Sequence, residues 1–120
     1  KSKELNKVKT EGKYLDRVKE GFKQVLVSGG TGAAYVDSIY KPAGKTGTAQ
    51  SFLDTDGDRI IDTATTTATF AAYAPYDNPE VVFTVISPDV APEEVSYSSM
   101  SRVNTRISQK VSKKYFEIYR

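Results

Sequence analysis

A cation, two hydroxyls and a residue without a side chain stand side by side near the middle of this sequence. They are Lys45, Thr46, Gly47 and Thr48, called here the KTGT box, within the stretch AGKTGTAQ. The surrounding pattern predicts a strand over 44–53. One interpretation is structural, because edge strands often carry a lysine that hinders aggregation and a strand glycine often marks a bulge. The other interpretation is functional: the cation and the hydroxyls bind a substrate or take part in catalysis. The remaining sequence features help to distinguish the two interpretations.

The composition excludes several kinds of catalytic site. The 120 residues include no histidine and no cysteine. Serine–histidine–aspartate and cysteine–histidine catalysis therefore have no imidazole to work with, and Cys/His zinc sites and disulfides are absent. The chain has 38% hydrophobic and 27% charged residues, which is typical of a globular protein, and no apolar run long enough to span a membrane.

The stretch DTDGDRIID is a second candidate site, for a hard cation. Asp54, Asp56, Asp58 and Asp62 fall at positions 1, 3, 5 and 9 of a calcium-loop pattern. Arg59 stands where such a loop needs glycine, and position 12 lacks the bidentate acid. Calcium binding at 54–62 is therefore one expectation. The alternative is a solvent-exposed loop without a metal, in which the Asp-Gly pair makes the turn.

Apolar residues at helical spacing predict two helices that position these sites. The first helix is predicted over 13–28, where SGGTG at 28–32 ends it because glycine accepts the left-handed cap conformation. The last helix is predicted near the end of the chain, with Ser98 or Ser99 as its N-cap. The apolar face of the first helix comprises Tyr14, Leu15, Val18, Phe22, Val25 and Leu26, and that of the last comprises Met100, Val103, Ile107, Val111, Tyr115 and Ile118.

Between the helices the pattern predicts three strands. Residues 33–43 are expected to connect or to form a short strand, followed by the strand over 44–53. TATTTATFAAYA at 63–74 is rich in β-branched residues, and EVVFTVIS at 80–87 is an apolar run that predicts a central strand. PYDNP between them is turn chemistry, so these two strands form an antiparallel hairpin. The predicted fold class is α+β, a three-stranded antiparallel sheet packed against the N-terminal and C-terminal helices.

Charge is unevenly distributed along the chain. Residues 1–24 carry eight basic and four acidic residues, residues 25–101 three and ten, and residues 102–120 six and one. The plain interpretation is two solvated helix faces, and the functional one is attraction to an anionic membrane or wall polymer. No compact basic patch with interleaved aromatics is visible, so nucleic-acid binding is not expected.

The KTGT box in its context resembles the third signature box of the penicillin-binding proteins and serine β-lactamases. A cap-like SGGTG precedes it, and a hairpin with FAAYAP, the strand VVFTVIS and an amphipathic terminal helix follow. That order of elements is similar to the carboxy-terminal part of the transpeptidase domain of a class B penicillin-binding protein. The resemblance covers about residues 13–119.

The resemblance implies a role for each member of the box. The family acts on a D-alanyl-D-alanine stem peptide or on a β-lactam that imitates it, and both carry a carboxylate. Lys45 would supply positive charge near the active serine, and the hydroxyls of Thr46 and Thr48 would hydrogen-bond the substrate. Gly47 would let substrate lie against the strand. The backbone N–H of Thr48 would form half of the oxyanion hole. Lys45 and Thr48 are thus the candidate catalytic residues, and the whole box is the candidate substrate-binding site.

The family's two other boxes, S-x-x-K and S-x-N, precede its K-T-G box. The chain has no S-x-N triplet and one formal S-x-x-K, from Ser38 to Lys41. In the family that box opens a helix, whereas Pro42 here disfavours helix at Lys41. Ser38 is therefore not expected to be the nucleophile. The chain is interpreted as a fragment that lacks the nucleophile and is inactive alone, with 1–12 as a leader or frayed helix start and 13–120 as the C-terminal subdomain.

The sequence thus predicts a piece of a peptidoglycan D,D-transpeptidase that works by serine acyl transfer, binds β-lactams and needs no cofactor. Its expected partners are the stem peptide and the remainder of the transpeptidase domain, and the isolated fragment could self-associate through its open sheet edge. The expected location is the extracytoplasmic face of the bacterial cell membrane, anchored through a segment outside this chain. The alternatives are a serine β-lactamase or D,D-carboxypeptidase of the same superfamily, and a small non-catalytic calcium-binding surface module.

Overall fold

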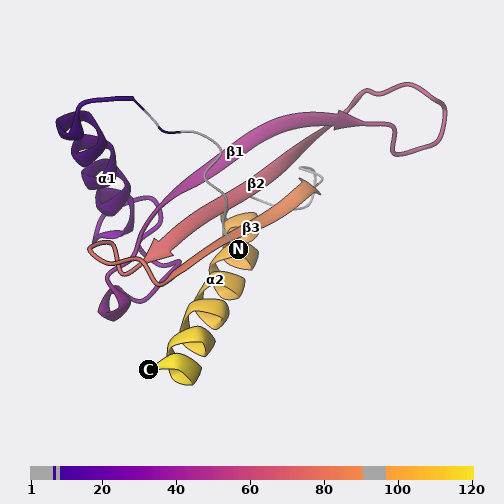
Figure 1. Cartoon of the computed structure of the whole chain (residues 1–120). Coiled ribbons are helices and arrows are strands. Elements are labelled where there is room, and N and C mark those ends of the chain that lie inside the picture. Colours follow the sequence, from indigo (N-terminus) through magenta and orange to yellow (C-terminus); the bar gives the residue numbers. More distant parts are fainter. Residues whose placement is uncertain (1–6, 8, 91–96) are drawn as a thin grey trace.

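The computed structural model describes residue 7 and residues 9–90 and 97–120, with side chains of the last helix described from residue 103. Along the chain come helix α1 (Gly12–Leu26), a short 3-10 helix η1 (Ser38–Tyr40), strands β1 (Ala43–Leu53), β2 (Thr63–Ala74) and β3 (Val81–Val90), and helix α2 (Tyr97–Tyr119). The expected α+β arrangement is confirmed (Figure 1).

The three strands form one antiparallel sheet in the order β1-β2-β3. Thr46 of β1 lies opposite Phe70 of β2, which in turn lies opposite Val85 of β3. β1 and β2 make a long hairpin whose connecting loop lies at the end of the sheet far from α1 (Figure 1). The predicted strand boundaries agree with the observed ones within three residues, and those of β2 are the same.

The prediction that 80–87 forms a central strand is wrong for this chain. Within the described residues β3 pairs only with β2, so β2 is the central strand. A continuous apolar run predicts burial on both faces of a strand. Here one face of β3 is uncovered, and the side chains of Val82 and Ile86 are 76% and 60% exposed.

The two faces of the sheet differ in what covers them. Successive side chains of a strand point to opposite faces. The inner face carries Phe70 and Val85, both buried, and is covered by α2 and by the segment between α1 and β1. The outer face carries Lys45, Ala71 and Ile86, all exposed.

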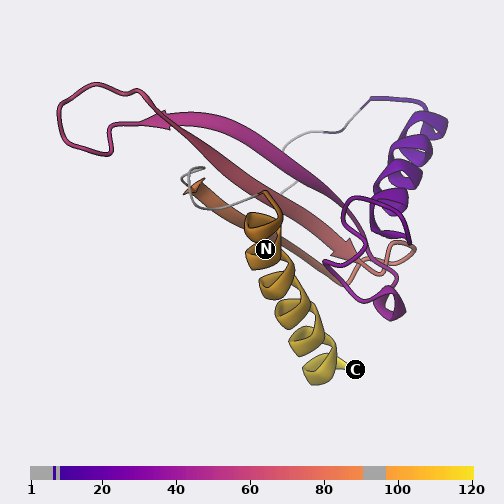
Figure 2. The ribbon, with the colours of Figure 1, turned by 180° about the vertical axis from the view of Figure 1, so that it is seen from behind.

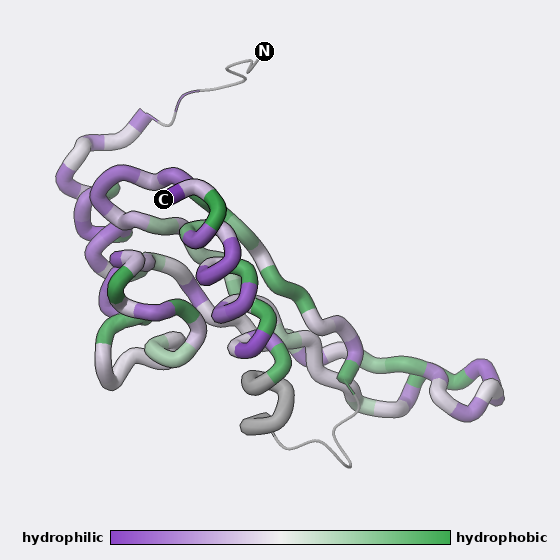
Figure 3. Tube along the Cα trace, turned by 90° about the horizontal axis from the view of Figure 1, so that it is seen from below, coloured by the Kyte–Doolittle hydropathy of each residue, from purple (hydrophilic) through white to green (hydrophobic). Residues whose placement is uncertain are grey.

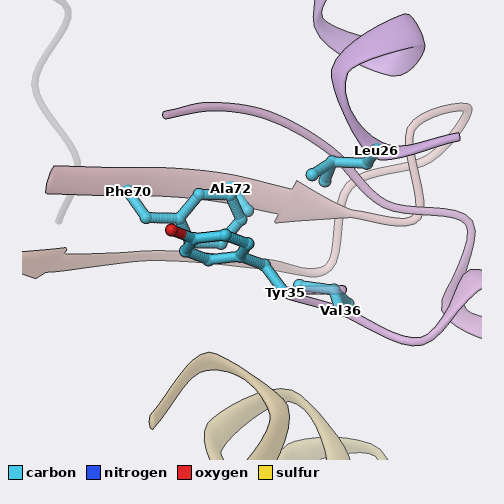
Figure 4. Close-up of a cluster of buried hydrophobic side chains, with 5 residues drawn as sticks. All are labelled: Leu26, Tyr35, Val36, Phe70 and Ala72. Carbon is cyan, nitrogen blue, oxygen red and sulfur yellow. The ribbon is translucent and has the colours of Figure 1, made fainter. Parts of the chain in front are cut away.

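The core lies where the end of α1 and the segment after it meet the inner face. Phe70 is fully buried, and its ring centroid is 4.4 Å from that of Tyr35. Figure 4 shows the Tyr35 and Phe70 rings facing one another, with Leu26 reaching in from the end of α1. The remaining members of this cluster are Val36 and Ala72. Apolar burial of this kind is the main stabilising term in a small domain.

Helix α1 buries only its last turn. It ends at Leu26, two residues before the predicted end, and Gly29 takes the left-handed conformation (φ 86°) in the turn that follows. The rest of its predicted apolar face is not buried, because Tyr14, Leu15 and Val18 are exposed. Figures 1 and 2 show that α1 lies beside one end of the sheet, so its first turns have no strand beneath them.

Helix α2 faces the sheet with a different stripe from the predicted one. The predicted apolar residues Val103, Ile107, Val111 and Ile118 are exposed, whereas each buried position lies one residue after predicted position 103, 107, 111 or 115. Successive residues of a helix point about 100° apart, so the buried face is rotated by that angle from the predicted one. The buried residues of α2 are Asn104, Ser108, Ser112 and Phe116. In Figure 3 hydrophobic and hydrophilic segments alternate along α2.

Specific polar and aromatic contacts hold α2 against the sheet. The Asn104 side chain donates to the carbonyl of Ala68 at 3.1 Å and accepts from the hydroxyl of Ser87 at 2.6 Å. Farther along, the ring of Phe116 stacks on Tyr40 with centroids 4.4 Å apart. Small side chains between these contacts let the helix approach the sheet closely, at the cost of turning its apolar stripe outward.

Other expectations fall wholly or partly outside the described residues. Residues 1–6 and 8 of the predicted leader lie outside the described residues, as do 91–96. Because α2 begins at Tyr97, Ser98 and Ser99 lie in its first turn and not at its N-cap, and their side chains and that of Met100 are not described. Neither α1 nor the described length of α2 combines the length and apolarity that crossing a bilayer requires.

Two polar residues on the buried face of α2, Asn104 and Ser108, are expected to have opposite effects on the free energy of unfolding. Replacing Asn104 by alanine leaves the Ser87 hydroxyl and the Ala68 carbonyl without their buried partner, and should cost about 1–3 kcal/mol. The Ser108 hydroxyl is buried and has no partner among the described residues, so Ser108→Ala should be neutral or stabilising by up to about 1 kcal/mol. Urea unfolding monitored by circular dichroism measures both, and equal losses in the two variants would contradict this packing.

Candidate functional site

The KTGT box lies on β1, the other edge of the sheet. Within the described residues β1 pairs only with β2. Lys45 and Gly47 belong to the outer face, while Thr46 and Thr48 belong to the inner face. An edge strand can accept another extended chain alongside it, because alternate backbone groups along it are not used by its single neighbour. The box is therefore placed where a peptide could add to the sheet.

The ammonium of Lys45 lies against the backbone of its own strand. Its Nζ donates to the carbonyl oxygen of Thr46 at 2.6 Å, and the side chain is exposed. A charged donor on an exposed edge is available to an incoming anion, because breaking one contact to a neutral carbonyl costs little in water. The geometry thus permits the anion-binding role that the resemblance implies.

The absence of a side chain at Gly47 also has a packing reason within the sheet. A Cβ at Gly47 would collide with the hydroxyl of Thr69, the residue opposite it on β2. Thr69 therefore occupies the space that a side chain at position 47 would fill. This packing reason stands beside the implied one, in which substrate lies against the glycine.

A hollow of about 280 Å³ on the sheet includes the first three members of the box. Its lining comprises Lys45, Thr46, Gly47, Thr69, Phe70, Ala71, Thr84 and Ile86. The outer-face members of this set are hydroxyls, methyl groups and one cation, which suits a ligand with a carboxylate and short apolar side chains.

A larger hollow of about 590 Å³ lies elsewhere, between the end of α1, the segment over 28–40 and α2. Leu26, Val36 and Tyr40 give it an apolar wall, and Asp37 and Lys113 lie at its lining. It contains no member of the KTGT box. Size alone therefore does not identify the site, and the chemistry of the side chains favours the smaller hollow.

The structure excludes Ser38 and Lys41 as a helical S-x-x-K pair. Ser38 begins the 3-10 helix η1, and Lys41 ends it with a left-handed backbone (φ 49°). The Lys41 ammonium lies 3.3 Å from the carboxylate of Asp77, at the turn between β2 and β3. The lysine is therefore engaged in an ion pair away from the KTGT box and is not stacked one α-helical turn from the serine.

The acidic loop brings together three of its four predicted ligands. One carboxylate oxygen from each of Asp54, Asp56 and Asp58 lies within 4.8 Å of the others, and Asp62 is not part of the group. Asp54 accepts hydrogen bonds from the backbone N–H groups of Gly57 and Arg59, which hold the pKa of Asp54 below its ordinary value. Arg59 adopts the left-handed conformation (φ 72°) expected of glycine at this position. Calcium binding stays a prediction, which calorimetry at millimolar calcium can test.

Two residues near the box were not identified from the sequence. The hydroxyl of Thr31 lies 3.3 Å from that of Thr46, and the hydroxyl of Thr69 lies over Gly47. Both contacts join residues at least 15 positions apart. No local pattern marks them, although the spacing of β1 and β2 about their loop could have placed Thr69 opposite Gly47.

Comparison with known proteins matches most of this chain to one family. Residues 1–113 match the family described as the penicillin binding protein transpeptidase domain. The chain is 38% identical over 114 residues to penicillin-binding protein 2A of Bacillus subtilis, which covers 95% of this chain and 16% of that protein.

Two further relatives carry related names. Over 78 residues the chain is 40% identical to peptidoglycan D,D-transpeptidase MrdA of Haemophilus influenzae, covering 59% of this chain and 12% of that protein. Over 89 residues it is 36% identical to penicillin-binding protein 2B of Streptococcus pneumoniae, covering 71% of this chain and 12% of that protein. The chain thus spans less than a fifth of the length of these curated relatives.

We expect Gly47→Ala to destabilise the sheet through Thr69. The new methyl group would force the Thr69 side chain out of its rotamer, at a cost of about 1–3 kcal/mol. The double variant Gly47→Ala/Thr69→Ala should recover most of that loss. Urea unfolding measures both, with Gly21→Ala as a control, since a methyl group at Gly21 has open space. A Gly47→Ala loss that Thr69→Ala leaves unchanged would show that the collision is not the cause.

Proposed function

Because this chain belongs to the penicillin-binding protein transpeptidase domain family, we propose that it is one wall of the active cleft of a peptidoglycan D,D-transpeptidase. The observation that carries the proposal is the KTGT box on the exposed edge strand β1, with the cation of Lys45 accessible. The whole enzyme would cross-link cell-wall stem peptides and bind β-lactams. This piece would bind and orient the acyl donor.

Three members of the box, Lys45, Thr46 and Thr48, have a proposed role. The Lys45 ammonium attracts the terminal carboxylate and supports the proton network around the active serine. The hydroxyls of Thr46 and Thr48 donate hydrogen bonds to the substrate, including its carboxylate. The N–H of Thr48 contributes to the oxyanion hole, where such a donor typically lowers the barrier by about 3–4 kcal/mol.

The proposed reaction is acyl transfer through a serine ester. A serine hydroxyl supplied from outside this chain attacks the carbonyl carbon of the penultimate D-alanine. The amide C–N bond breaks, and the serine's proton goes to the departing amine of the terminal D-alanine. The amino group of a second stem peptide then attacks the ester carbonyl, a new amide C–N bond forms as the C–O bond breaks, and a proton from the amine passes to the serine oxygen and restores the hydroxyl. A β-lactam follows the first step only as far as ring opening, because its leaving nitrogen remains attached. No metal or organic cofactor takes part.

The remainder of the transpeptidase domain is the proposed partner of this chain. The outer face of the sheet exposes Val82, and α2 exposes an apolar stripe that includes Val103, Ile107 and Val111. Exposed apolar surface of this extent is typical of an interaction site. Without that partner, the open edge of β3 should promote self-association of the isolated chain, which sedimentation velocity would detect.

The transpeptidase is preferred here to a β-lactamase, a D,D-carboxypeptidase or a calcium-binding surface module. The support is the family match over 1–113 and the names of the relatives, which are penicillin-binding proteins and a peptidoglycan D,D-transpeptidase. The proposed location is the extracytoplasmic face of the bacterial membrane, where the stem peptides are, with anchoring by a part of the protein outside this chain.

Covalent labelling by a fluorescent penicillin tests the proposal. The intact protein that contains this chain should be labelled, and Lys45→Ala should slow acylation by about a hundredfold or more, the range typical of a lost transition-state contact. Lys110→Ala, which removes an exposed lysine from α2, is the matched control and should leave the rate unchanged. The isolated 120-residue chain should not be labelled. Labelling of that isolated chain would overturn the proposed division of the active site.

A further inference from the structure

The hydroxyl of Thr31 contacts the KTGT box from a segment that the box does not include. Its Oγ1 lies 3.3 Å from the Oγ1 of Thr46. Thr31 belongs to the SGGTG stretch, which the sequence explains only as the end of α1. The contact places a second hydroxyl beside that of Thr46, to which the proposed function assigns substrate binding.

Two glycines fix the position of Thr31. The N–H of Gly30 donates to Val27 and that of Gly32 to Val25, both at 2.9 Å, so the turn closes back on the end of α1. A Cβ at Gly30 would lie 2.5 Å from the carbonyl oxygen of Gln24, and one at Gly32 would lie 2.5 Å from the Leu26 side chain. The backbone on each side of Thr31 is therefore packed against its neighbours, and Thr31 is the one side chain among these three residues.

A hydroxyl has one proton to donate and two lone pairs to accept with. If Thr31 donates to Thr46, the Thr46 proton is free to be donated to an anion. The hydrogen bond from Thr31 also polarises the Thr46 hydroxyl, which strengthens the bond that it donates. Without Thr31, the Thr46 hydroxyl can rotate to other acceptors, including the nearby backbone.

We propose that Thr31 is a positioning residue that orients the Thr46 hydroxyl toward the substrate carboxylate. This inference rests on the proposed function, in which Thr46 binds that carboxylate. Thr31 is exposed and Thr46 is half-buried, so water can replace their mutual hydrogen bond. Exposed hydrogen bonds contribute little to stability. Thr31 should therefore affect acylation and leave the melting temperature unchanged.

The test uses the intact protein that contains this chain and the rate constant for acylation by a fluorescent penicillin. Thr31→Val keeps the shape and removes the hydroxyl, and should slow acylation about five- to tenfold, the effect of one neutral hydrogen bond. Thr31→Ser restores the hydroxyl and should return the rate to within about twofold of wild type. Thr55→Val is the matched control, because it breaks a similar hydroxyl pair, Thr55 with Thr63 at 2.9 Å, at the far end of the same hairpin.

A double-mutant cycle separates positioning from an independent contact. Thr46→Val alone should slow acylation, and adding Thr31→Val to it should slow acylation no further. Multiplying effects, a wild-type rate in Thr31→Val or no recovery in Thr31→Ser would each overturn the inference while the wild-type protein is still labelled. An unlabelled wild-type protein would overturn the proposed function and this inference with it. If Thr31→Val does not fold, Thr31→Ala takes its place in the cycle.

Discussion

The structure depends on the burial of one face of one strand. Phe70, at the middle of β2, is fully buried, and the segment after α1 reaches it through Tyr35. The same face receives α2, whose Asn104 bonds to the backbone of Ala68 two residues away. Because α2 and both outer strands contact β2, the position of the KTGT box follows from how β1 pairs with that strand. Besides that pairing, the turn after α1 reaches the box through the hydroxyl of Thr31.

The pairing of β1 with β2 also gives the two glycines of β1 a structural reason. A Cβ at Gly44 would collide with the backbone of Ala71, and one at Gly47 would collide with the hydroxyl of Thr69. A glycine in a strand interior normally weakens the strand, so two of them on one strand need a packing reason. Here that reason lies in the residues opposite them, and the threonines of the box gain fixed positions from it.

Much of the fold was predictable because its signals are local. The boundaries of β2 and the turn after it followed from β-branched residues and from PYDNP, and SGGTG marked the end of α1. Two errors have a common cause. The outer face of β3 and the apolar stripe of α2 were assigned to the interior by hydropathy, whereas this chain buries Asn104, Ser108 and Ser112 instead. Hydropathy ranks residues by how readily they are buried, but it does not say which neighbour is present to bury them.

The residues of the candidate site could be identified from the sequence, but the residues that contact them from elsewhere in the chain could not. The KTGT box lies on a strand, as its residues indicated. Thr31 and Thr69 approach it from other parts of the chain, and such contacts depend on the turn after α1 and on strand register.

The rotation of α2 also affects how substitutions in this chain should be interpreted. A mutational scan of the isolated piece would score changes along the outward stripe, which includes Ile107 and Val111, as harmless, because nothing in the described part of the chain covers those side chains. Under the proposed function, the remainder of the domain covers these side chains in the whole protein, so the same substitutions there should be destabilising. Mutational scans of the isolated chain and of the whole protein should therefore differ most at the residues of that stripe.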